Sequence, residues 1–583
     1  MDVKSFLDAL HFNVDGVRPL DYEPDWDDAP LPYKLYRHRP VVPLSAQVPL
    51  TLEHGLYDGN AAGTLPLRAL HVGHFLWYSY GLTRVSETVV RTTSAEYPVE
   101  ADPFRDVMYS YRRFVPSGGA LYPNELYVYL KAEDVAPGLY HYDAAHHRLV
   151  GLREGNFDEY MEKALGHRAK VSECLGMVFV STVFWKNFFK YHNFSYRLQG
   201  LDTGVLVGQL LEMAPRFGLE AQVYYHFVDR AVNHLLGLAE NEETVYAVIP
   251  LSQKAFANSG LALHTRHDAH LATPASDMPR VSSGSSVSAE QLCQELPELK
   301  HDHYVKSRRL VPYPMLVQAN QACYHASTDS FQRTLEIQTG SARAVGRFGP
   351  GGSVGSVKSV GGNGTGIDST VPLPRVSSLS YDLAAVCRQR ISPGEDFVLE
   401  KIDDAQLAAL LSDTVSRVYQ RDWLQSRHKP SGQTLGWSVD LYLCLYKVDG
   451  LLDGAYQYDV TTHSLRLVRA GDHRDWLQRS MSVANVNLFQ VPLCFHVVGN
   501  RSHYVDEFGV RGYRIQQMEA GVLVQKLLLA ATALGMGGNP LLSFDTKLCD
   551  ELYNLNLSNQ TCLIQIPIGF YRSRPKLEGS LRS

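Results

Sequence analysis

Two arginine motifs in the C-terminal part of the chain could bind a phosphate group. The segment CRQRIS supplies Arg388, Arg390 and Ser392. The segment GFYRSR supplies Arg572 and Arg574. A phosphate monoester needs about two charge-assisted donors, preferably arginine forks, together with hydroxyl or backbone N–H groups. The same spacing also suits solvated arginines on an amphipathic helix, so both interpretations remain open on the residues alone.

A glycine-containing turn and a Lys-Tyr pair lie nearer the start of the chain. The turn consists of Pro116, Ser117, Gly118 and Gly119. Its small residues would let backbone N–H and C=O groups approach a ligand closely, although Pro-Ser-Gly is more often an ordinary turn. Lys190 is followed directly by Tyr191, and an isolated lysine is usually a solvated surface residue. Neither motif assigns a function by itself.

The chain repeats itself, and the repeat contains these motifs. The segment YRLQGLDTGVLVGQLLEMAPRFGL begins at Tyr196 and matches YRIQQMEAGVLVQKLLLAATALGM, which begins at Tyr513, without a gap. Two further pairs recur in the same order: PSGGALYPNELYVYLK with PSGQTLGWSVDLYLCLYK, and GLYHYDAAHHRL with GAYQYDVTTHSL. Three matched blocks in one order indicate two copies of one domain.

Each copy predicts the same order of strands and helices. An alternating strand (ELYVYLK or DLYLCLYK) leads to a hairpin with a Tyr-x-Tyr-Asp element, followed by a helical stretch. A hydrophobic strand (GMVFVSTVFW or VPLCFHVVGN) precedes a long apolar helix that begins near Gly204 or Gly521. A last strand (TVYAVIPL or TCLIQIPIGF) ends the copy. Mixed strands and helices in this order predict an α+β fold.

The domain boundaries follow from the repeat. We expect domains at residues 1–260 and 376–583, joined by a connecting region at 261–375. That region contains an apparent helix around residues 314–336. It also contains the run FGPGGSVGSVKSVGGNGTG, whose composition is typical of a flexible linker.

Composition excludes several classes of function. The chain has 583 residues, and Lys plus Arg total 55 against 61 for Asp plus Glu, so its net charge of -6 gives no footprint for nucleic acid. No apolar run approaches the roughly 20 residues that span a bilayer, and the start MDVKSFLDALHFNVDG lacks a signal-peptide pattern. The 8 cysteines are scattered without a C-x-x-C pair. We expect a cytoplasmic protein that binds neither nucleic acid, membrane nor metal.

The ordered motifs resemble one branch of a known superfamily. PSGGALYPNELYVYL, GLYHYD and KYHNFSYRLQGLDTG, in this order, resemble the SagB-type or McbC-type branch of the nitroreductase superfamily, and so does the lead-in DWDDAPLPYKLY. The resemblance covers most of residues 20–250 and, more weakly, residues 380–572. It implies two fused nitroreductase-like domains that form a pseudo-dimer with FMN at their interface. It also implies oxidation of thiazoline or oxazoline rings in a peptide.

The resemblance assigns the motifs to one composite site. The arginine motifs of the second copy, with Ser392, correspond to the FMN phosphate site, and the Pro-Ser-Gly-Gly turn of the first copy corresponds to a flavin contact. Lys190 and Tyr191 match the pair associated with catalysis in McbC-type oxidases, whereas the second copy has Glu507 and Phe508. We therefore expect one FMN per chain, a second site that is dead, and a monomer that replaces the usual homodimer.

The implied reaction needs a base and a hydride acceptor. Azole formation removes a proton from the activated ring carbon and transfers a hydride, which N5 of the flavin accepts in this family. Lys190 or Tyr191 would be the base, and dioxygen the final acceptor. A free lysine has a pKa of about 10.4, so burial or a neighbouring cation would have to lower it.

The substrate would be a peptide or a carrier-bound peptide, and a cyclodehydratase or synthetase would be the partner. One alternative is an NAD(P)H-dependent flavin reductase of nitroaromatics or quinones. Another is a non-catalytic scaffold in a peptide-modifying complex. Val205 follows Gly204 where the branch often has Gly-His, which implies a different substrate pocket.

Overall fold

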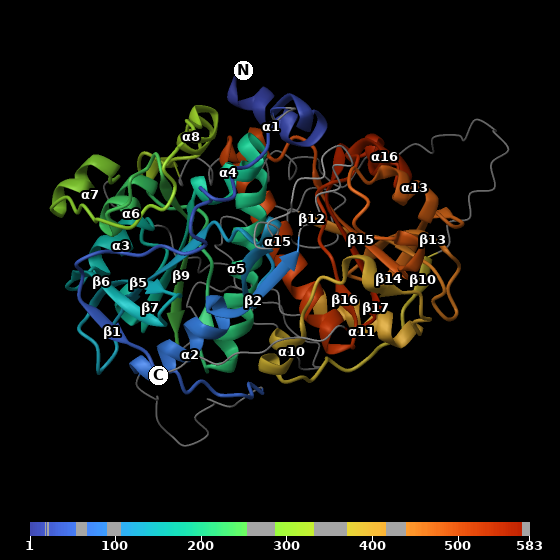
Figure 1. Cartoon of the computed structure of the whole chain (residues 1–583), viewed down its shortest axis with the longest axis horizontal. Coiled ribbons are helices and arrows are strands. Elements are labelled where there is room, and N and C mark those ends of the chain that lie inside the picture. The colour runs from blue at the N-terminus through green and yellow to red at the C-terminus, as the bar shows by residue number, and fades with distance from the viewer. Residues whose placement is uncertain are drawn as a thin grey trace, which may run out of the picture.

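Two large antiparallel sheets flank a central pair of long helices (Figure 1). This arrangement confirms the predicted α+β fold with two domains. A computed structural model of the chain describes residues 1–17, 19, 22–53, 67–89, 107–253, 286–330, 370–415 and 439–573. The Gly-rich run of the connecting region lies outside these residues, and so does the second copy's Pro-Ser-Gly segment.

The first domain is built on a seven-stranded sheet with the order β1-β6-β5-β4-β7-β9-β8. Its strands are β1 (Val41–Pro43), β4 (Asn124–Leu130), β5 (Gly138–Asp143), β6 (Arg148–Glu154), β7 (Gly176–Val183), β8 (Glu220–Ala221) and β9 (Glu243–Ser252). A separate hairpin pairs β2 (Leu82–Val89) with β3 (Val107–Arg113). This hairpin leads directly into the Pro-Ser-Gly-Gly turn and from there into β4.

The second domain repeats the sheet strand for strand, in the order β10-β14-β13-β12-β15-β17, with β16 beside β17. Its strands are β10 (Thr370–Pro372), β11 (Phe397–Val398), β12 (Val439–Leu445), β13 (Gly454–Asp459), β14 (Ser464–Ala470), β15 (Leu493–Asn500), β16 (Gly537–Gly538) and β17 (Gln560–Tyr571). The additional short strand β11 pairs with the end of β17. The strands predicted from the repeated blocks are therefore present in both domains.

Helices cover both sheets, so the central strands are buried on both faces. Those of the first domain are α1 (Val3–Phe12), α2 (Ala69–Tyr80), α3 (Asp158–Ala164), α4 (Trp185–Tyr191), α5 (Ser195–Arg216) and α6 (Asp229–Leu236). The connecting region adds α7 (Ala289–Glu295) and α8 (Pro314–Gln321). The second domain has α10 (Leu383–Gln389), α11 (Asp404–Val415), α13 (Arg474–Ser480), α14 (Val505–Phe508), α15 (Arg511–Ala533) and α16 (Thr546–Leu552). No helix among the described residues is long and apolar enough to cross a membrane.

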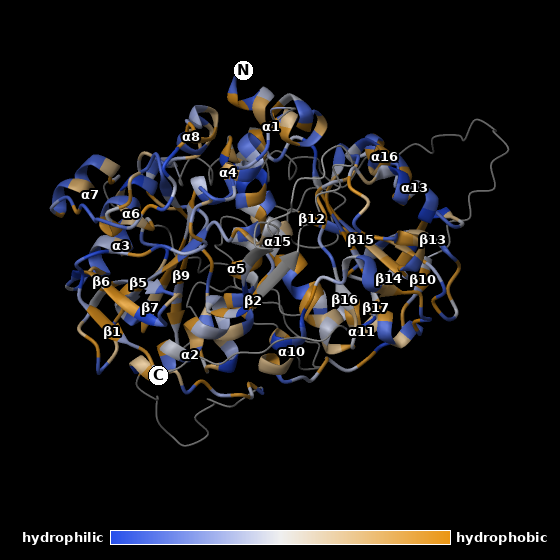
Figure 2. Ribbon diagram, viewed as in Figure 1, coloured by the Kyte–Doolittle hydropathy of each residue, from blue (hydrophilic) through white to orange (hydrophobic). Residues whose placement is uncertain are grey.

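Burial explains the composition of the strands. Every residue of β4 and β12 is buried, because helices lie on both faces, and apolar colour runs along the strands while outer helices such as α13 are more polar (Figure 2). Some of the charged groups inside are paired. Glu125 on β4 accepts a hydrogen bond from His141 at 2.8 Å and contacts the ammonium group of Lys186, as buried ions require.

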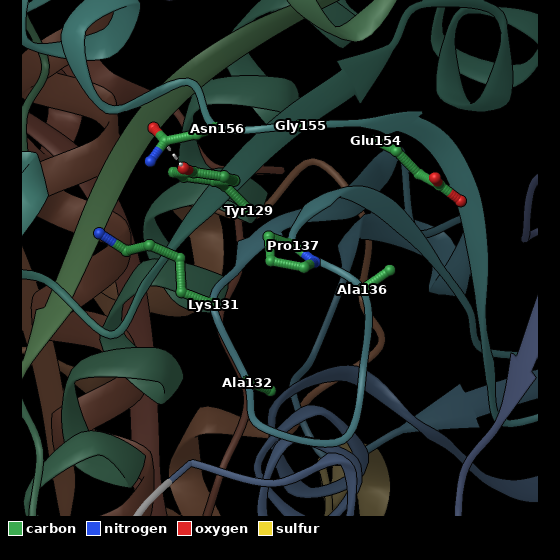
Figure 3. Close-up of a pocket in the computed structure, with 8 residues that line it drawn as sticks. All are labelled: Tyr129, Lys131, Ala132, Ala136, Pro137, Glu154, Gly155 and Asn156. Carbon is green, nitrogen blue, oxygen red and sulfur yellow. Dashed lines mark hydrogen bonds between the residues drawn. The ribbon is translucent and has the colours of Figure 1, made fainter.

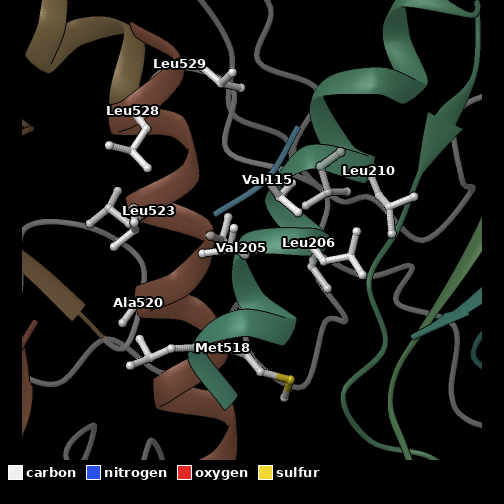
Figure 4. Packing of buried hydrophobic residues seen from close by; sticks show 14 of the residues in the cluster. Val115, Val205, Leu206, Leu210, Met518, Ala520, Leu523, Leu528 and Leu529 are labelled. Carbon is white, nitrogen blue, oxygen red and sulfur yellow. The ribbon is translucent and has the colours of Figure 1, made fainter. Parts of the chain in front are cut away.

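The domains meet where α5 crosses α15, and backbone touches backbone at the crossing. A Cβ atom added to Gly204 would lie 1.9 Å from the carbonyl oxygen of Met518. One added to Gly521 would lie 2.2 Å from the carbonyl oxygen of Leu201. Apolar side chains from both helices pack around this contact (Figure 4). The helices begin at Ser195 and Arg511, well before the starts predicted near the two glycines. The glycines permit the two helices to approach closely and do not mark where a helix begins.

Two further contacts at the crossing join a glycine of α5 to a glutamine of α15. Gly200 lies against the side chain of Gln517, whose Cβ would be 2.7 Å from an added Cβ. Gly208 lies against Gln525 in the same way, at 3.0 Å. In the sequence repeat, position 200 corresponds to 517 and position 208 to 525. Equivalent positions of the two copies therefore pair a small residue with a large one.

Buried arginines connect both domains to the connecting region. Arg511 at the start of α15 donates to both carboxylate oxygens of Asp229, at 2.9 and 2.8 Å, and to the Cys323 carbonyl oxygen at 2.7 Å. One turn later, Arg514 donates to Asn320 on α8 at 3.2 Å. The side chains that make these contacts are buried. Breaking the pair of Arg511 and Asp229 would therefore leave an unpaired buried charge.

We expect Gly204→Ala to destabilise the protein by about 1–3 kcal/mol, because its Cβ atom would overlap the Met518 carbonyl oxygen and force α5 away from α15. Thermal unfolding followed by fluorescence would show a lower melting temperature. Gly73→Ala on α2 is the matched control, since its nearest neighbour is a side-chain atom, Leu44 Cβ, at 3.2 Å. Equal melting temperatures for both variants would contradict the backbone contact.

Candidate functional site

The Pro-Ser-Gly-Gly turn has a backbone that requires glycine. Gly119 has a φ of 63°, and Ala120 and Tyr122 have φ values of 57° and 48°. Only glycine adopts this left-handed region without steric cost, so the two later residues are held there by their surroundings. Part of that support comes from Ser117, whose hydroxyl oxygen accepts a hydrogen bond from the Tyr122 N–H at 2.9 Å.

Asp202 on α5 holds the Pro-Ser-Gly-Gly turn in place through hydrogen bonds. Its carboxylate accepts a hydrogen bond from the Ser117 hydroxyl at 2.6 Å and one from the Gly118 N–H at 3.2 Å. Asp202 is only 8 % exposed, and burial raises its pKa to about 7, although the two hydrogen bonds act in the opposite direction. The turn is thus attached to the helix that makes the domain interface.

Lys190 and Tyr191 at the end of α4 lie against the same turn. A Cβ atom added to Gly119 would be 2.5 Å from the Tyr191 hydroxyl oxygen and 3.1 Å from the Lys190 ammonium nitrogen. The Lys190 nitrogen also lies 5.2 Å from the Trp26 ring centre and 5.0 Å from the Tyr191 ring centre. The glycine therefore leaves room for both functional groups to converge beside the backbone of the turn.

Arg390 brings the second domain to this place. It follows the last residue of α10, and its Nε donates to the Phe114 carbonyl oxygen at 2.8 Å, two residues before Pro116. Arg390 is 8 % exposed, and its Nη1 is buried with no hydrogen-bond partner among the described residues. A buried guanidinium with an unused donor is suited to an anionic ligand. The side-chain-free backbone at Gly119, the two polar groups beside it and the buried donor of Arg390 are groups that suit a flavin with a phosphate tail.

The other predicted phosphate ligands lie differently. Arg388 is exposed and donates to the Leu50 carbonyl oxygen at 2.9 Å, so its environment differs from that of the buried Arg390. Ser392 is exposed. Arg572 is also exposed, but its backbone N–H donates to the Asp396 carbonyl oxygen at 3.0 Å, which keeps the end of β17 beside the segment that follows Arg390. Arg574 lies outside the described residues.

The equivalent positions in the second domain have a different environment. Phe508 on α14 corresponds to Tyr191, and its ring packs against His226 of the first domain at 5.6 Å between ring centres. His226 is buried and is hydrogen-bonded to His325 of the connecting region at 3.0 Å. At this position an apolar ring packs where the first domain has a phenol.

Sequence reasoning did not identify Asp202 as part of the site. The available signal was an acidic residue in an otherwise apolar helix, aligned with Glu519 in the second copy. Such a residue must have a buried partner. That the partner is the Pro-Ser-Gly turn follows only from the three-dimensional structure.

A separate surface pocket has no connection with these residues. It has a volume of about 580 Å³ and is lined by Tyr129, Lys131, Ala132, Ala136, Pro137, Glu154, Gly155 and Asn156 (Figure 3). It lies beyond the C-terminal end of β4, whereas the turn precedes the N-terminal end of the same strand. The length of β4 separates the two places.

Comparison with known proteins decides the family. The family model described as "Nitroreductase family" matches residues 86–251 and 388–570, which are more than half of the chain. The chain belongs to the nitroreductase family. The two matched regions coincide with the two sheets, and members of this family are flavin-dependent oxidoreductases that typically bind FMN.

Individual relatives of this nitroreductase agree on the fold. A crystal structure from Anabaena variabilis ATCC 29413, assigned to the nitroreductases, is 19% identical with a TM-score of 0.64, and the match covers 98% of this chain and 100% of that one. The trifolitoxin-processing protein TfxB of Rhizobium leguminosarum bv. trifolii is 31% identical over 136 residues, 22% of this chain. That match spans 36% of TfxB, about a third of its length.

The Escherichia coli microcin synthetase McbBCD complex with truncated pro-MccB17 is also similar. It is 16% identical over 46% of this chain and 99% of the matched chain. Its TM-score of 0.27 is too low for the superposition to support an argument.

The raised pKa of Asp202 predicts a pH-dependent stability. Because the folded protein holds this proton up to about pH 7 and the unfolded chain releases it near 3.8, the stabilising contribution is complete below pH 4 and is lost as the pH rises through 7. Asp202→Asn should therefore melt a few degrees higher than the wild type at pH 8, with a smaller advantage at pH 5. Exposed Asp475→Asn is the control, and parallel melting curves for both variants would refute the assignment.

Proposed function

We propose that this nitroreductase is an FMN-dependent oxidase that converts a thiazoline or oxazoline ring in a peptide into a thiazole or oxazole. The observation that carries the proposal is the convergence of Lys190 and Tyr191 on Gly119 in a turn whose preceding residue Phe114 is bonded to Arg390, which has a buried donor without a partner among the described residues. The proposal is supported by the motif resemblance to azoline oxidases and by the similarity to TfxB, whose name assigns it a role in processing trifolitoxin.

In this proposal one site is assembled from both domains. Arg390 of the second domain would hold the flavin phosphate through a charge-assisted hydrogen bond. The backbone of residues 116–119 in the first domain would contact the ring system, since Gly119 presents no side chain. Asp202 holds the turn in place. Arg388 donates to the Leu50 carbonyl oxygen, and Ser392 and Arg572 would add further donors to the phosphate. Arg574 lies outside the described residues.

Lys190 and Tyr191 are the residues that we assign to proton removal from the azoline ring. The bound flavin supplies the hydride acceptor. Lys190 faces two aromatic rings, an environment that favours a cation, so we assign proton removal from the azoline ring carbon to the Tyr191 oxygen, with the charged Lys190 beside it stabilising the phenolate. The second domain has an apolar Phe508 at the position of Tyr191, so the pseudo-symmetric site would lack this function. The chain would therefore work as a monomer with one FMN and dioxygen as the final acceptor.

The substrate is a peptide, free or bound to a carrier, and the partner is the cyclodehydratase or synthetase that forms the azoline ring. An NAD(P)H-dependent reductase of nitroaromatics or quinones would use the same flavin site. The two differ in the electron donor: an azoline peptide should bleach the flavin absorbance of the oxidase under anaerobic conditions, whereas NADPH should bleach that of a reductase.

Arg390→Ala should weaken FMN binding by about tenfold or more, because the phosphate loses a buried charge-assisted donor. Wild-type protein purified gently should be yellow with one FMN per chain, and the variant should be colourless after the same dialysis. Arg388→Ala is a matched control from the same segment, and it should keep its flavin. A yellow Arg390→Ala protein would contradict the composite site.

Lys190→Ala and Tyr191→Phe should both retain FMN and lose turnover of an azoline peptide, by about 10²-fold or more for the residue that removes the proton. Single-turnover flavin reduction monitored by absorbance separates this step from reoxidation by dioxygen. The larger loss should occur in Tyr191→Phe. Unchanged flavin reduction in both variants would remove these residues from the reaction.

A further inference from the structure

Three arginines from both domains gather near the Pro-Ser-Gly-Gly turn. Arg84 on β2 and Arg112 on β3 are direct cross-strand partners in the hairpin of the first domain. Directly opposed residues of an antiparallel pair project from the same face of the sheet. Like charges in this arrangement are destabilising, so a bound anion between them would stabilise the hairpin.

Arg390 of the second domain lies beside this pair. Its guanidinium is bonded to the carbonyl oxygen of Phe114, which continues β3 only two residues after Arg112. Burial lowers the pKa of Arg390, and the positive charges of Arg84 and Arg112 lower it further. The charges of both hairpin arginines thus act on the guanidinium group of Arg390.

Within the described part of the chain, no carboxylate forms an ion pair or a hydrogen bond with any of the three arginine side chains. Neighbouring Arg113 shows the contrast: it points to the other face of the hairpin, is buried, donates to the Pro32 carbonyl oxygen at 2.9 Å and stacks on the Tyr80 ring at 3.9 Å. These contacts give Arg113 a structural role. Among the described residues, the Arg84 and Arg112 side chains have no such partners, and the buried Nη1 of Arg390 has none there either.

We propose that Arg84 and Arg112 join Arg390 in binding the phosphate monoester of FMN, so that the β2–β3 hairpin closes the phosphate end of the site. This inference rests on the proposed flavin site. A phosphate monoester carries about two negative charges and has three acceptor oxygens near neutral pH, more than one arginine can neutralise. The hairpin belongs to the domain that provides the turn and the Lys-Tyr pair, so each domain would hold the phosphate from one side.

Flavin titration tests this inference without measuring turnover. Flavin-free wild-type protein and Arg84→Ala/Arg112→Ala would be titrated with FMN and with riboflavin, which lacks the phosphate, and binding followed by quenching of flavin fluorescence. The control is Arg68→Ala/Arg479→Ala, which removes the same charge from two exposed arginines that form surface ion pairs. We expect the FMN dissociation constant of the hairpin variant to rise by about tenfold or more, with less difference at high salt, and the riboflavin constant to stay unchanged.

Each other outcome contradicts a different statement. An unchanged FMN constant in the hairpin variant, or equal weakening of FMN and riboflavin, would overturn the role of Arg84 and Arg112 and leave the flavin site intact. An equal effect in the control variant would reduce the result to net charge and also overturn it. Wild-type protein that binds neither flavin would overturn the proposed function together with this inference.

Discussion

The backbone contact between α5 and α15 is the constraint on which the composite site depends. Gly204 and Gly521 let the two helices approach until a carbonyl oxygen of each occupies the space of the missing Cβ. This contact fixes the separation of the two sheets. Asp202, two residues before Gly204, holds the turn, and Arg390 from the other domain reaches the chain just before that turn. A shift of the crossing would therefore separate the residues that we assign to the phosphate from those assigned to the ring.

Much of the fold could be predicted from the sequence because the same pattern of segments occurs in both domains. Alternating and apolar segments in matched order predict the strands β4, β7, β9, β12, β15 and β17, and the structure contains all of them. The starts of α5 and α15 could not be predicted correctly, since glycine usually weakens a helix and here is required by a neighbouring helix. The hydrophobic pattern of one segment does not show which helix packs against it.

The candidate site was predictable in its motifs and not in its contacts. The spacing of Arg388 and Arg390 gives no reason to distinguish them. Arg388 lies within α10 and is exposed, whereas Arg390 follows the end of α10 and is buried between the domains. Arg84 and Arg112 belong to no recognised motif, and only the pairing of β2 with β3 brings them together. Sequence reasoning works where function depends on residue type, and it fails where function depends on which segments the tertiary structure makes adjacent.

The contacts of Gly200 with Gln517 and of Gly208 with Gln525 have a consequence for which helices can pair. In a symmetric dimer each of these positions would face its own copy, giving either two glycines and a void or two glutamines and a clash. Only two different sequences can fill the space with one small and one large residue. Such pairs favour the contact between the two different helices over a contact of either helix with a second copy of itself.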